Sequence, residues 1–214
     1  MLFNLLKKDF ILTKKYLIFL LIYAVGMPIV FTLEETQFRG TSTFIFIVMI
    51  IEYMMLSTVW SNEEKNKGSI LLCTTPYTRS ELVKEKYLFL VVVFILNFIL
   101  YTATALFIPI GMKKLSILEV GIALLISAIV FGIYIPILYK YGLQKTRYIG
   151  MIILFATIFG SPKLLSWMSL NHISINFNIS NMSMILNSVI YLIALFIGLI
   201  SMYISMGIYA KKDL

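Results

Sequence analysis

Long stretches of this chain carry no Lys, Arg, Asp or Glu, and this distribution of charge restricts its fold more than any other feature. Residues 16–33, 87–112 and 164–210 are all free of charge. A soluble domain has about 25% charged residues, whereas this chain has 13% charged and 60% hydrophobic residues. A hydrocarbon core of about 30 Å requires about 20 apolar residues of helix, and lipid offers backbone groups no hydrogen-bond partner. We therefore predict an integral membrane protein of transmembrane α-helices.

Six apolar segments are candidates for these helices, and we expect them to form a single transmembrane domain over residues 1–214. The predicted spans are residues 16–33, 41–61, 87–110, 118–139, 148–162 and 186–209. The fifth span is too short to cross the hydrocarbon core as a straight helix, at about 1.5 Å per residue. It either tilts or continues into the apolar residues 164–170 beyond Pro162. The predicted fold class is all-α, with six transmembrane helices.

The basic residues indicate the orientation, because Lys and Arg collect in the cytoplasmic loops of membrane proteins. With the N-terminus inside, the outer segments hold only Arg39, Lys113, Lys114 and Lys163, so that 14 of the 18 Lys and Arg residues lie inside. We therefore predict that both ends of the chain are cytoplasmic. The Asn- and Ser-rich residues 163–185 then form the longest extracellular segment. This distribution also explains the net charge of +8 without a nucleic-acid partner.

Residues 1–15 have the pattern of a basic amphipathic helix. At about 100° per residue, the four lysines share one face and the leucines lie mainly on the other, although Asp9 and Ile11 interrupt the pattern. Such a helix lies in the membrane interface with its lysines towards anionic headgroups. We interpret it as an interfacial helix that anchors the topology, with movement during a transport cycle as the alternative.

Residues 62–86 are the longest polar inner segment. They predict a short helix at 62–73, a turn at 74–77 and a further helix from Arg79 that enters the third span. Pro76 ends the first of these helices, because proline lacks the backbone donor and restricts the residue before it. Thr78 and Glu81 have the spacing of a capping box, which marks the start of the second. A short helix between two spans can serve as a docking surface, and the alternative is an ordinary loop.

Three short motifs in this segment give a family resemblance. The acidic stretch EEKNKG at 63–68 is followed by TPYTR at 75–79 and by VKEKY at 83–87. In these motifs, and in its layout over the whole chain, the sequence resembles the permease subunits of type-2 ABC exporters. It is most similar to the permeases that export phenol-soluble modulins and antimicrobial peptides in Gram-positive bacteria. The run CTTP at 73–76 departs from the Ser-Leu-Pro-like run of many such permeases.

The resemblance implies a permease in the bacterial plasma membrane that forms a homodimer and binds two copies of a separate cytosolic ABC ATPase. Residues 62–73 would be the coupling helix, and the cargo would be amphipathic, cytolytic or antimicrobial peptides or similar hydrophobic compounds. The chain has no G-x-x-x-x-G-K-[ST] motif, so ATP and Mg would bind to the partner and this chain would not itself be an enzyme. The residues expected to face the ATPase are Glu63, Glu64, Lys65, Asn66, Lys67, Gly68, Ser69 and Arg79. The alternative for any one of them is an ordinary solvated position.

Four polar or aromatic residues inside the predicted spans are candidates for the substrate path. They are Glu52, Tyr53, Asn97 and Tyr101. A carboxylate at membrane depth costs several kcal/mol unless it is paired, hydrated or protonated, so Glu52 either lines a polar path for cationic cargo or fixes packing within the bundle. Asn97 and Tyr101 share a helix face, and the alternative for them is a structural hydrogen bond between helices.

Other functions fit the sequence less well. His172 is the only histidine, and we predict no metal site because such sites need several converging ligands. Glu34, Arg39, His172 and Asn176 match two elements of the intramembrane glutamate-type proteases, but the F-x-x-x-H element of that group is absent. A further alternative is a membrane immunity protein that sequesters peptides without an ATPase. Copurification with an ABC ATPase would distinguish these alternatives from an exporter.

Overall fold

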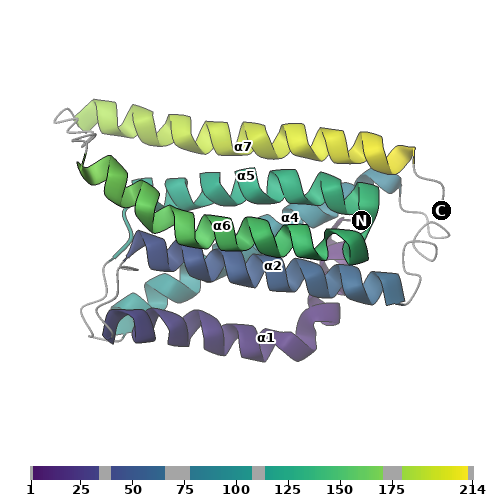
Figure 1. Cartoon of the computed structure of the whole chain (residues 1–214), viewed down its shortest axis with the longest axis horizontal. Helices are drawn as coiled ribbons and strands as arrows, with labels where there is room; N and C mark the ends of the chain where they lie inside the picture. The colour runs from purple at the N-terminus through teal and green to yellow at the C-terminus, as the bar shows by residue number, and fades with distance from the viewer. Residues whose placement is uncertain (1, 34–39, 66–77, 108–113, 171–179, 212–214) are drawn as a thin grey trace.

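The computed structural model describes residues 2–33, 40–65, 78–107, 114–170 and 180–211. Within these ranges all regular secondary structure is helical, and the long helices run side by side along the longest axis of the molecule (Figure 1). The helices are α1 (Leu2–Leu33), α2 (Thr41–Lys65), α4 (Arg79–Phe107), α5 (Ile117–Tyr141), α6 (Leu143–Leu170) and α7 (Ser180–Ala210). The all-α prediction is confirmed for this part of the chain.

Four helices among the described residues are long and apolar enough to cross a membrane. They are α2, α4, α5 and the Asn187–Ala210 part of α7. A fifth is added if the two halves of α1 are counted as one span. The chain is therefore a multi-pass membrane protein, and the six-span topology stays a prediction.

The first helix differs from its predicted division into an interfacial helix at 1–15 and a span from residue 16. α1 continues through this boundary and bends by 49° between Leu2–Ile18 and Leu20–Thr32. Leu5, Leu6 and Asp9 on its first half are buried against the rest of the bundle. The first half of α1 thus packs with one face against other helices of the protein.

Several predicted boundaries also move. α2 does not end at residue 61 but runs to Lys65, and the remainder of the predicted coupling helix, residues 66–73, lies outside the described residues. α6 continues to Leu170, which agrees with the alternative that the short fifth span extends beyond Pro162. α7 begins at Ser180. The predicted extracellular segment 163–185 is therefore helical at both of its ends.

The start of α4 is the boundary that the sequence predicted best. The Glu81 carboxylate accepts from the Thr78 backbone N–H at 2.9 Å, and the Thr78 hydroxyl accepts from the Glu81 N–H at 3.2 Å. This reciprocal pair is a capping box, and it satisfies backbone donors that the first turn of a helix leaves free. The predicted helix start at Arg79 is confirmed.

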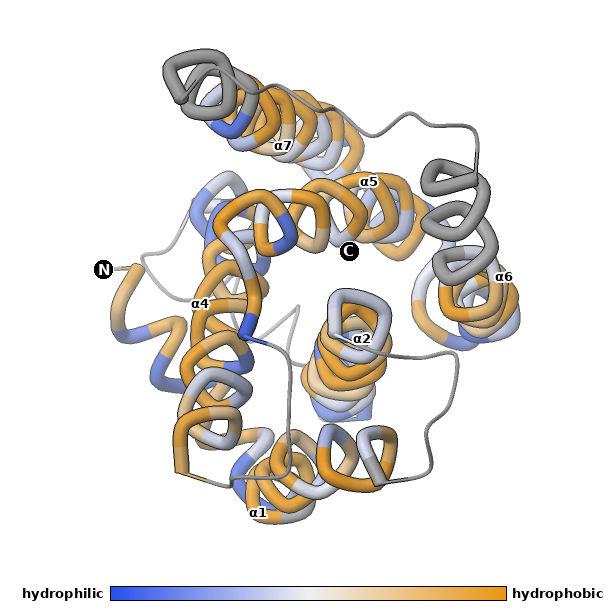
Figure 2. The backbone as a smooth tube through the Cα atoms, turned by 90° about the vertical axis from the view of Figure 1, so that its left-hand side faces the viewer, coloured by the Kyte–Doolittle hydropathy of each residue, from blue (hydrophilic) through white to orange (hydrophobic). Residues whose placement is uncertain are grey.

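α2 is the central helix of the bundle. Viewed along the helices, it is surrounded by α1, α4, α5 and α6, whereas α7 lies outside α5 and α4 (Figure 2). Phe44, Val48 and Leu56 of α2 are almost completely buried. The apolar side chains of α2 therefore pack against other helices of the protein. In contrast, Phe196 and Tyr203 of the outer helix α7 are 66% and 77% exposed.

Small residues allow α7 to lie close to α5. A Cβ on Gly132 would be 3.6 Å from the Cβ of Ser201, and the Ser201 hydroxyl donates to the Gly132 carbonyl. Tyr87 of α4 joins the same contact, because its hydroxyl lies 2.6 Å from the Ser201 Oγ and 2.8 Å from the Ser205 Oγ. Hydroxyl groups of α4 and α7 and a backbone carbonyl of α5 thus satisfy one another within an apolar environment.

Candidate functional site: the lysine-rich end of the bundle

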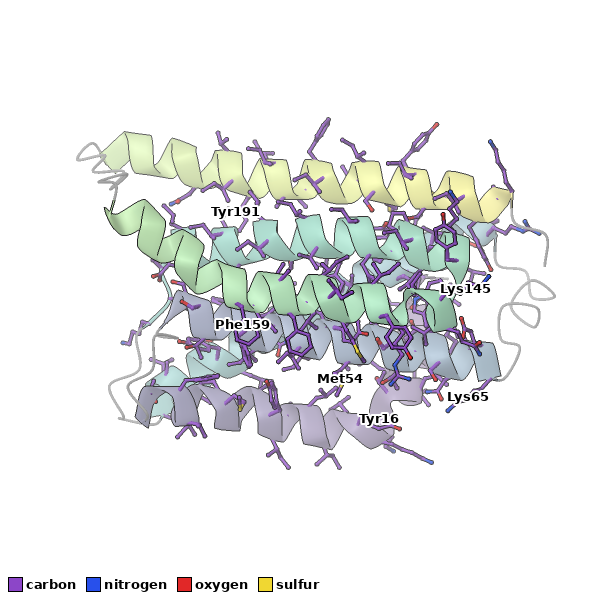
Figure 3. The ribbon with its side chains drawn as sticks, viewed as in Figure 1. Tyr16, Met54, Lys65, Lys145, Phe159 and Tyr191 are labelled. Atoms are coloured by element: carbon purple, nitrogen blue, oxygen red, sulfur yellow. The ribbon has the colours of Figure 1, made fainter. Side chains whose placement is uncertain are left out.

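Polar and charged side chains gather at one end of the bundle, which we call the lysine-rich end. It comprises the start of α1, the end of α2, the start of α4, the turn between α5 and α6, and the end of α7. Lys65 and Lys145 mark this end in Figure 3, and Tyr191 lies toward the other. The predicted ATPase-facing residues Glu63, Glu64, Lys65 and Arg79 all lie here.

Five charged side chains from three helices form a cluster at this end, which we call the buried-charge cluster. Its members are Lys8, Asp9, Glu63, Glu85 and Lys86. The Lys86 ammonium is 2.8 Å from Asp9 Oδ2, 2.8 Å from Glu63 Oε1 and 3.5 Å from Glu85 Oε2. The Lys8 ammonium is 2.6 Å from the same Glu63 oxygen and 3.2 Å from Asp9 Oδ1. The cluster thus connects α1, α2 and α4.

The inner members of this cluster are shielded from solvent. Asp9 and Glu85 are 0% exposed and Lys86 is 3% exposed. Removing such charges from water is costly, and this cost is offset only when each charge has close partners. Lys86 has three carboxyl groups within 3.5 Å, and Lys8 contacts two of the same three, so the two ammonium groups together offset the cost of burying these carboxyl groups of α1, α2 and α4.

Sequence reasoning missed this cluster. In the sequence, Asp9 interrupts the amphipathic pattern of residues 1–15. In the structure it lies on the buried face of α1, where it contacts Lys86. The signal was present in the sequence, since a lone acidic residue on an apolar face requires a buried partner. Its partner is 77 residues away, and the sequence alone does not identify it.

Glu64 contacts a different part of the bundle from its neighbour Glu63. Its Oε1 accepts from the backbone N–H of Leu143 at 2.7 Å, at the first residue of α6. The turn before α6 is a single residue, Gly142, with φ +77°, a conformation that favours glycine. A carboxylate at a helix N-terminus satisfies a free donor and interacts favourably with the helix dipole. Glu64 therefore joins the end of α2 to the α5–α6 turn.

Arg79 connects the start of α4 to the end of α7. Its Nη1 donates to the carbonyl of Ala210 at 3.0 Å and to that of Tyr209 at 3.4 Å. Carbonyls in the last turn of a helix have no partner within the helix, and a cation there also complements the helix dipole. Residues 66–77 are thus flanked by Glu63, Glu64 and Arg79, whose contacts reach α1, α4, α6 and α7.

The residues predicted to contact the ATPase therefore fall into three groups. Glu63, Glu64 and Arg79 contact other helices of this chain, and Lys65 lines a surface cleft. Asn66, Lys67, Gly68 and Ser69 lie outside the described residues. Contact of any of these residues with an ATPase stays a prediction.

The four candidates for the substrate path do not lie together on one surface. Glu52, Asn97 and Tyr101 are 1%, 4% and 3% exposed, so they lie inside the bundle. The Asn97 side-chain amide donates to the Val93 carbonyl of its own helix at 2.9 Å and not to a neighbouring helix. Tyr53 alone of the four lines a cleft. A role of these residues in transport stays a prediction.

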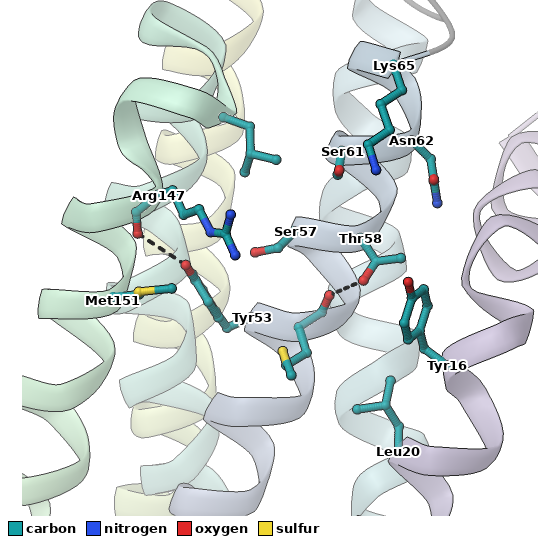
Figure 4. A pocket seen from close by; sticks show the side chains of 12 residues that line it. Tyr16, Leu20, Tyr53, Ser57, Thr58, Ser61, Asn62, Lys65, Arg147 and Met151 are labelled. Atoms are coloured by element: carbon teal, nitrogen blue, oxygen red, sulfur yellow. Dashed lines mark hydrogen bonds between the residues drawn. The ribbon is translucent and has the colours of Figure 1, made fainter.

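The cleft that Tyr53 lines lies between α1, α2 and α6 (Figure 4). It has a volume of about 280 Å³, and its polar lining comprises Tyr53, Ser57, Thr58, Ser61, Asn62, Lys65 and Arg147. The Tyr53 hydroxyl donates to the backbone carbonyl of Arg147 at 3.2 Å and so joins α2 to α6. The remaining lining residues are Tyr16, Leu20, Met54, Leu143 and Met151. We call it the α1–α2–α6 cleft.

The residues that match the intramembrane proteases are not covered by the structure. Glu34, Arg39, His172 and Asn176 all lie outside the described residues. Within the described residues, no group of three or more His, Cys, Asp or Glu side chains is placed to hold a metal ion.

Comparison with known protein families identifies a match over most of the chain. A family model described as "ABC-2 family transporter protein" matches residues 4–210, which is nearly the whole chain. No curated protein and no solved structure matches the chain.

Proposed function

Because this chain belongs to the ABC-2 family of transporter proteins, we propose that it is the transmembrane subunit of an ATP-driven exporter. Two copies would form the translocation path, and a separate cytosolic ABC ATPase would bind and hydrolyse ATP with Mg. The cargo we propose is an amphipathic, cytolytic or antimicrobial peptide or a similar hydrophobic compound. The family match carries the transporter assignment, and the resemblance to peptide-exporter permeases supports the cargo class.

The charge distribution supports the orientation in this proposal. Both chain ends lie at the same end of the bundle (Figure 1), and the lysines there are the ones that the positive-inside rule assigns to the cytoplasm. Residues 66–77 connect α2 and α4 at this end. In this orientation the end of α2 and the start of α4 lie on the cytoplasmic side, where the ATPase would bind.

The contacts that flank residues 66–77 suggest how an ATPase could move the bundle. Glu63 contacts the cluster of α1 and α4, Glu64 contacts the start of α6, and Arg79 contacts the end of α7. A displacement of residues 66–77 would therefore act on four helices through the polar contacts of three side chains. In this proposal Asn66, Lys67, Gly68 and Ser69 meet the ATPase, while Glu63, Glu64 and Arg79 position the helices.

Copurification tests the proposal directly. The chain is co-expressed with each ABC ATPase of its source bacterium, purified in detergent and reconstituted into liposomes, and ATP hydrolysis is measured with and without the permease. We expect one ATPase to copurify and its hydrolysis rate to depend on the permease. Lys67→Glu should weaken both effects, and Lys114→Glu, at the opposite end of the bundle, should leave them unchanged.

Two results would contradict the proposal. If no ABC ATPase copurifies, the peptide-sequestering alternative is favoured. If Lys67→Glu and Lys114→Glu both behave like the unmodified protein, residues 66–69 are not the docking segment, although the transporter assignment would stand.

A further inference from the structure

The α1–α2–α6 cleft contains two cations that nothing in the described part of the chain neutralises. Lys65 of α2 and Arg147 of α6 both line it, and neither side chain makes an ion pair or a hydrogen bond with a described residue. The two acidic residues next to Lys65 in sequence are already engaged, since Glu63 contacts Lys8 and Lys86, and Glu64 contacts the Leu143 N–H. Among the described residues, no carboxylate lines the cleft.

Neutral hydrogen-bonding groups lie between these two cations. Figure 4 shows the Arg147 guanidinium directed toward Ser57 and the Lys65 ammonium beside Ser61. Hydroxyl groups can donate to an anion, and a guanidinium binds phosphate oxygens with two parallel hydrogen bonds. This set of groups suits a phosphate ester better than a cation or an apolar ligand.

The depth of the cleft indicates where such an anion would come from. α2 has 25 residues and is about 37 Å long, which exceeds the hydrocarbon core of about 30 Å. Lys65 is its last residue and so lies at the headgroup level, and Ser57, about 12 Å further in, lies just inside the hydrocarbon core. The polar part of the cleft therefore crosses the boundary between the headgroups and the core. Tyr16, an amphipathic aromatic residue typical of this level, is 53% exposed at the cleft.

The remaining lining matches the apolar part of an amphiphile. Leu20 and Met151 line the side of the cleft that is farther from Lys65 (Figure 4). Met54 also lines the cleft, eleven residues before Lys65 on α2. Met54 and Met151 are 46% and 37% exposed, so acyl chains could contact them from the bilayer. The volume of about 280 Å³ is below the roughly 300–1,000 Å³ of pockets that enclose a drug-sized molecule. The cleft therefore suits a headgroup whose chains stay in the membrane.

We propose that the α1–α2–α6 cleft binds the phosphate headgroup of an anionic phospholipid from the cytoplasmic leaflet. Lys65 and Arg147 supply the positive charge, Ser57 and Ser61 supply hydroxyl donors, and Leu20, Met54 and Met151 contact the acyl chains. The inference uses the orientation given under the proposed function but neither the ATPase nor the cargo. Basic pockets between transmembrane helices on the cytoplasmic side are a recurrent form of lipid site.

Lipid retention tests this inference. The full chain is purified from membranes containing phosphatidylglycerol and phosphatidylcholine, and native mass spectrometry measures which lipid stays bound. We expect enrichment of phosphatidylglycerol over phosphatidylcholine. The double substitution Lys65→Gln and Arg147→Gln should reduce this enrichment by about tenfold or more, because each basic residue near an anionic surface contributes roughly a fivefold preference.

A matched control variant distinguishes a specific lipid site from general attraction between anionic lipids and basic residues. Lys145→Gln removes a cation from the same helix, two residues from Arg147, but Lys145 does not line the cleft. We expect it to keep the enrichment, whereas an equal loss in the control and in the double variant would overturn the site. Ser61→Ala, which keeps both cations, should give a smaller loss, and this second variant tests the site if the double variant does not fold.

A further arm distinguishes a lipid headgroup from a soluble phosphate. Retention is measured again after incubation with glycerol phosphate, which carries the same phosphate ester without acyl chains. We expect the bound phospholipid to remain. Displacement of phosphatidylglycerol by glycerol phosphate would overturn the lipid assignment in favour of a soluble ligand, and equal retention of the two lipids by the unmodified protein would overturn the site itself.

Discussion

Two sets of basic side chains lie at the lysine-rich end of the bundle, and they differ in how their charge is compensated. Lys86 and Lys8 lie in the buried-charge cluster, where each has at least two carboxylate contacts. Lys65 and Arg147 line the α1–α2–α6 cleft, where the described residues supply none. Burial explains the difference for Lys86, because a buried charge needs a partner within the fold and an exposed one does not.

The comparison also separates two roles of charge in this chain. The buried-charge cluster joins α1, the end of α2 and the start of α4. We propose that it stabilises the fold and transmits movement between these helices. The cleft presents charge at the surface, and we assign it to binding. Substitutions in the cluster should therefore mainly lower stability, whereas substitutions in the cleft should mainly change what the protein binds.

The largest effect is expected from Lys86→Met. This change removes the ammonium that contacts Asp9, Glu63 and Glu85 and leaves buried carboxyl groups without their main partner. We expect the free energy of unfolding to fall by about 3–5 kcal/mol, measured by denaturant or thermal unfolding in detergent. Lys84→Met, at an exposed position of the same helix, should change it by less than about 0.5 kcal/mol. Equal effects of the two substitutions would remove the distinction between the cluster and ordinary surface charge.

The second largest loss of stability is expected from Gly150→Ala, which disturbs the packing of α6 against α5 next to the cleft. A Cβ on Gly150 of α6 would lie 2.5 Å from the Tyr134 ring, and Tyr134 packs on the cleft residue Tyr53 with ring centroids 5.8 Å apart. Gly150→Ala should therefore destabilise the protein by about 1–3 kcal/mol without changing any charge. Gly160→Ala, in the same helix with nothing within 4 Å of its Cβ position, is the control and should not destabilise it. A stable Gly150→Ala variant would show that α6 can shift relative to α5.

The sequence predicted the helices better than it predicted their polar contacts. The six predicted apolar segments overlap the six helices of the described residues, although not their boundaries, and Thr78 and Glu81 located the start of α4 because a capping box is a local signal. Each of these signals lies within one helix or repeats at a helical spacing.

The cluster and the cleft could not be predicted in this way, because each depends on residues that are distant in the sequence. Asp9 and Lys86 are 77 residues apart, and Lys65 and Arg147 come from α2 and α6. Glu63 and Glu64 looked equivalent as neighbouring charges, yet successive residues of a helix point in different directions. Which helix each of them meets is determined by the packing of the bundle.

A smaller effect is expected at Glu64, which lies between the two regions. Its carboxylate accepts from the Leu143 N–H at the start of α6, so Glu64→Ala should cost about 1 kcal/mol, as the loss of a helix cap does. Glu64→Gln keeps an acceptor oxygen and should cost less. Unfolding in detergent measures both variants. If the Gln variant were as unstable as the Ala variant, the charge and not the hydrogen bond would be the main contribution.

The smallest effect on stability is expected from the double substitution Lys65→Gln and Arg147→Gln in the cleft. Neither cation has a partner among the described residues, so their removal leaves no buried carboxylate uncompensated. In detergent without phospholipid we expect the free energy of unfolding to change by less than about 0.5 kcal/mol. A ligand that binds only the folded state stabilises it according to its concentration and affinity. Added phosphatidylglycerol should therefore raise the unfolding temperature of the unmodified protein more than that of the double variant. A double variant as unstable as Lys86→Met would mean that the two cations hold the fold together, and the contrast between the cluster and the cleft would be lost.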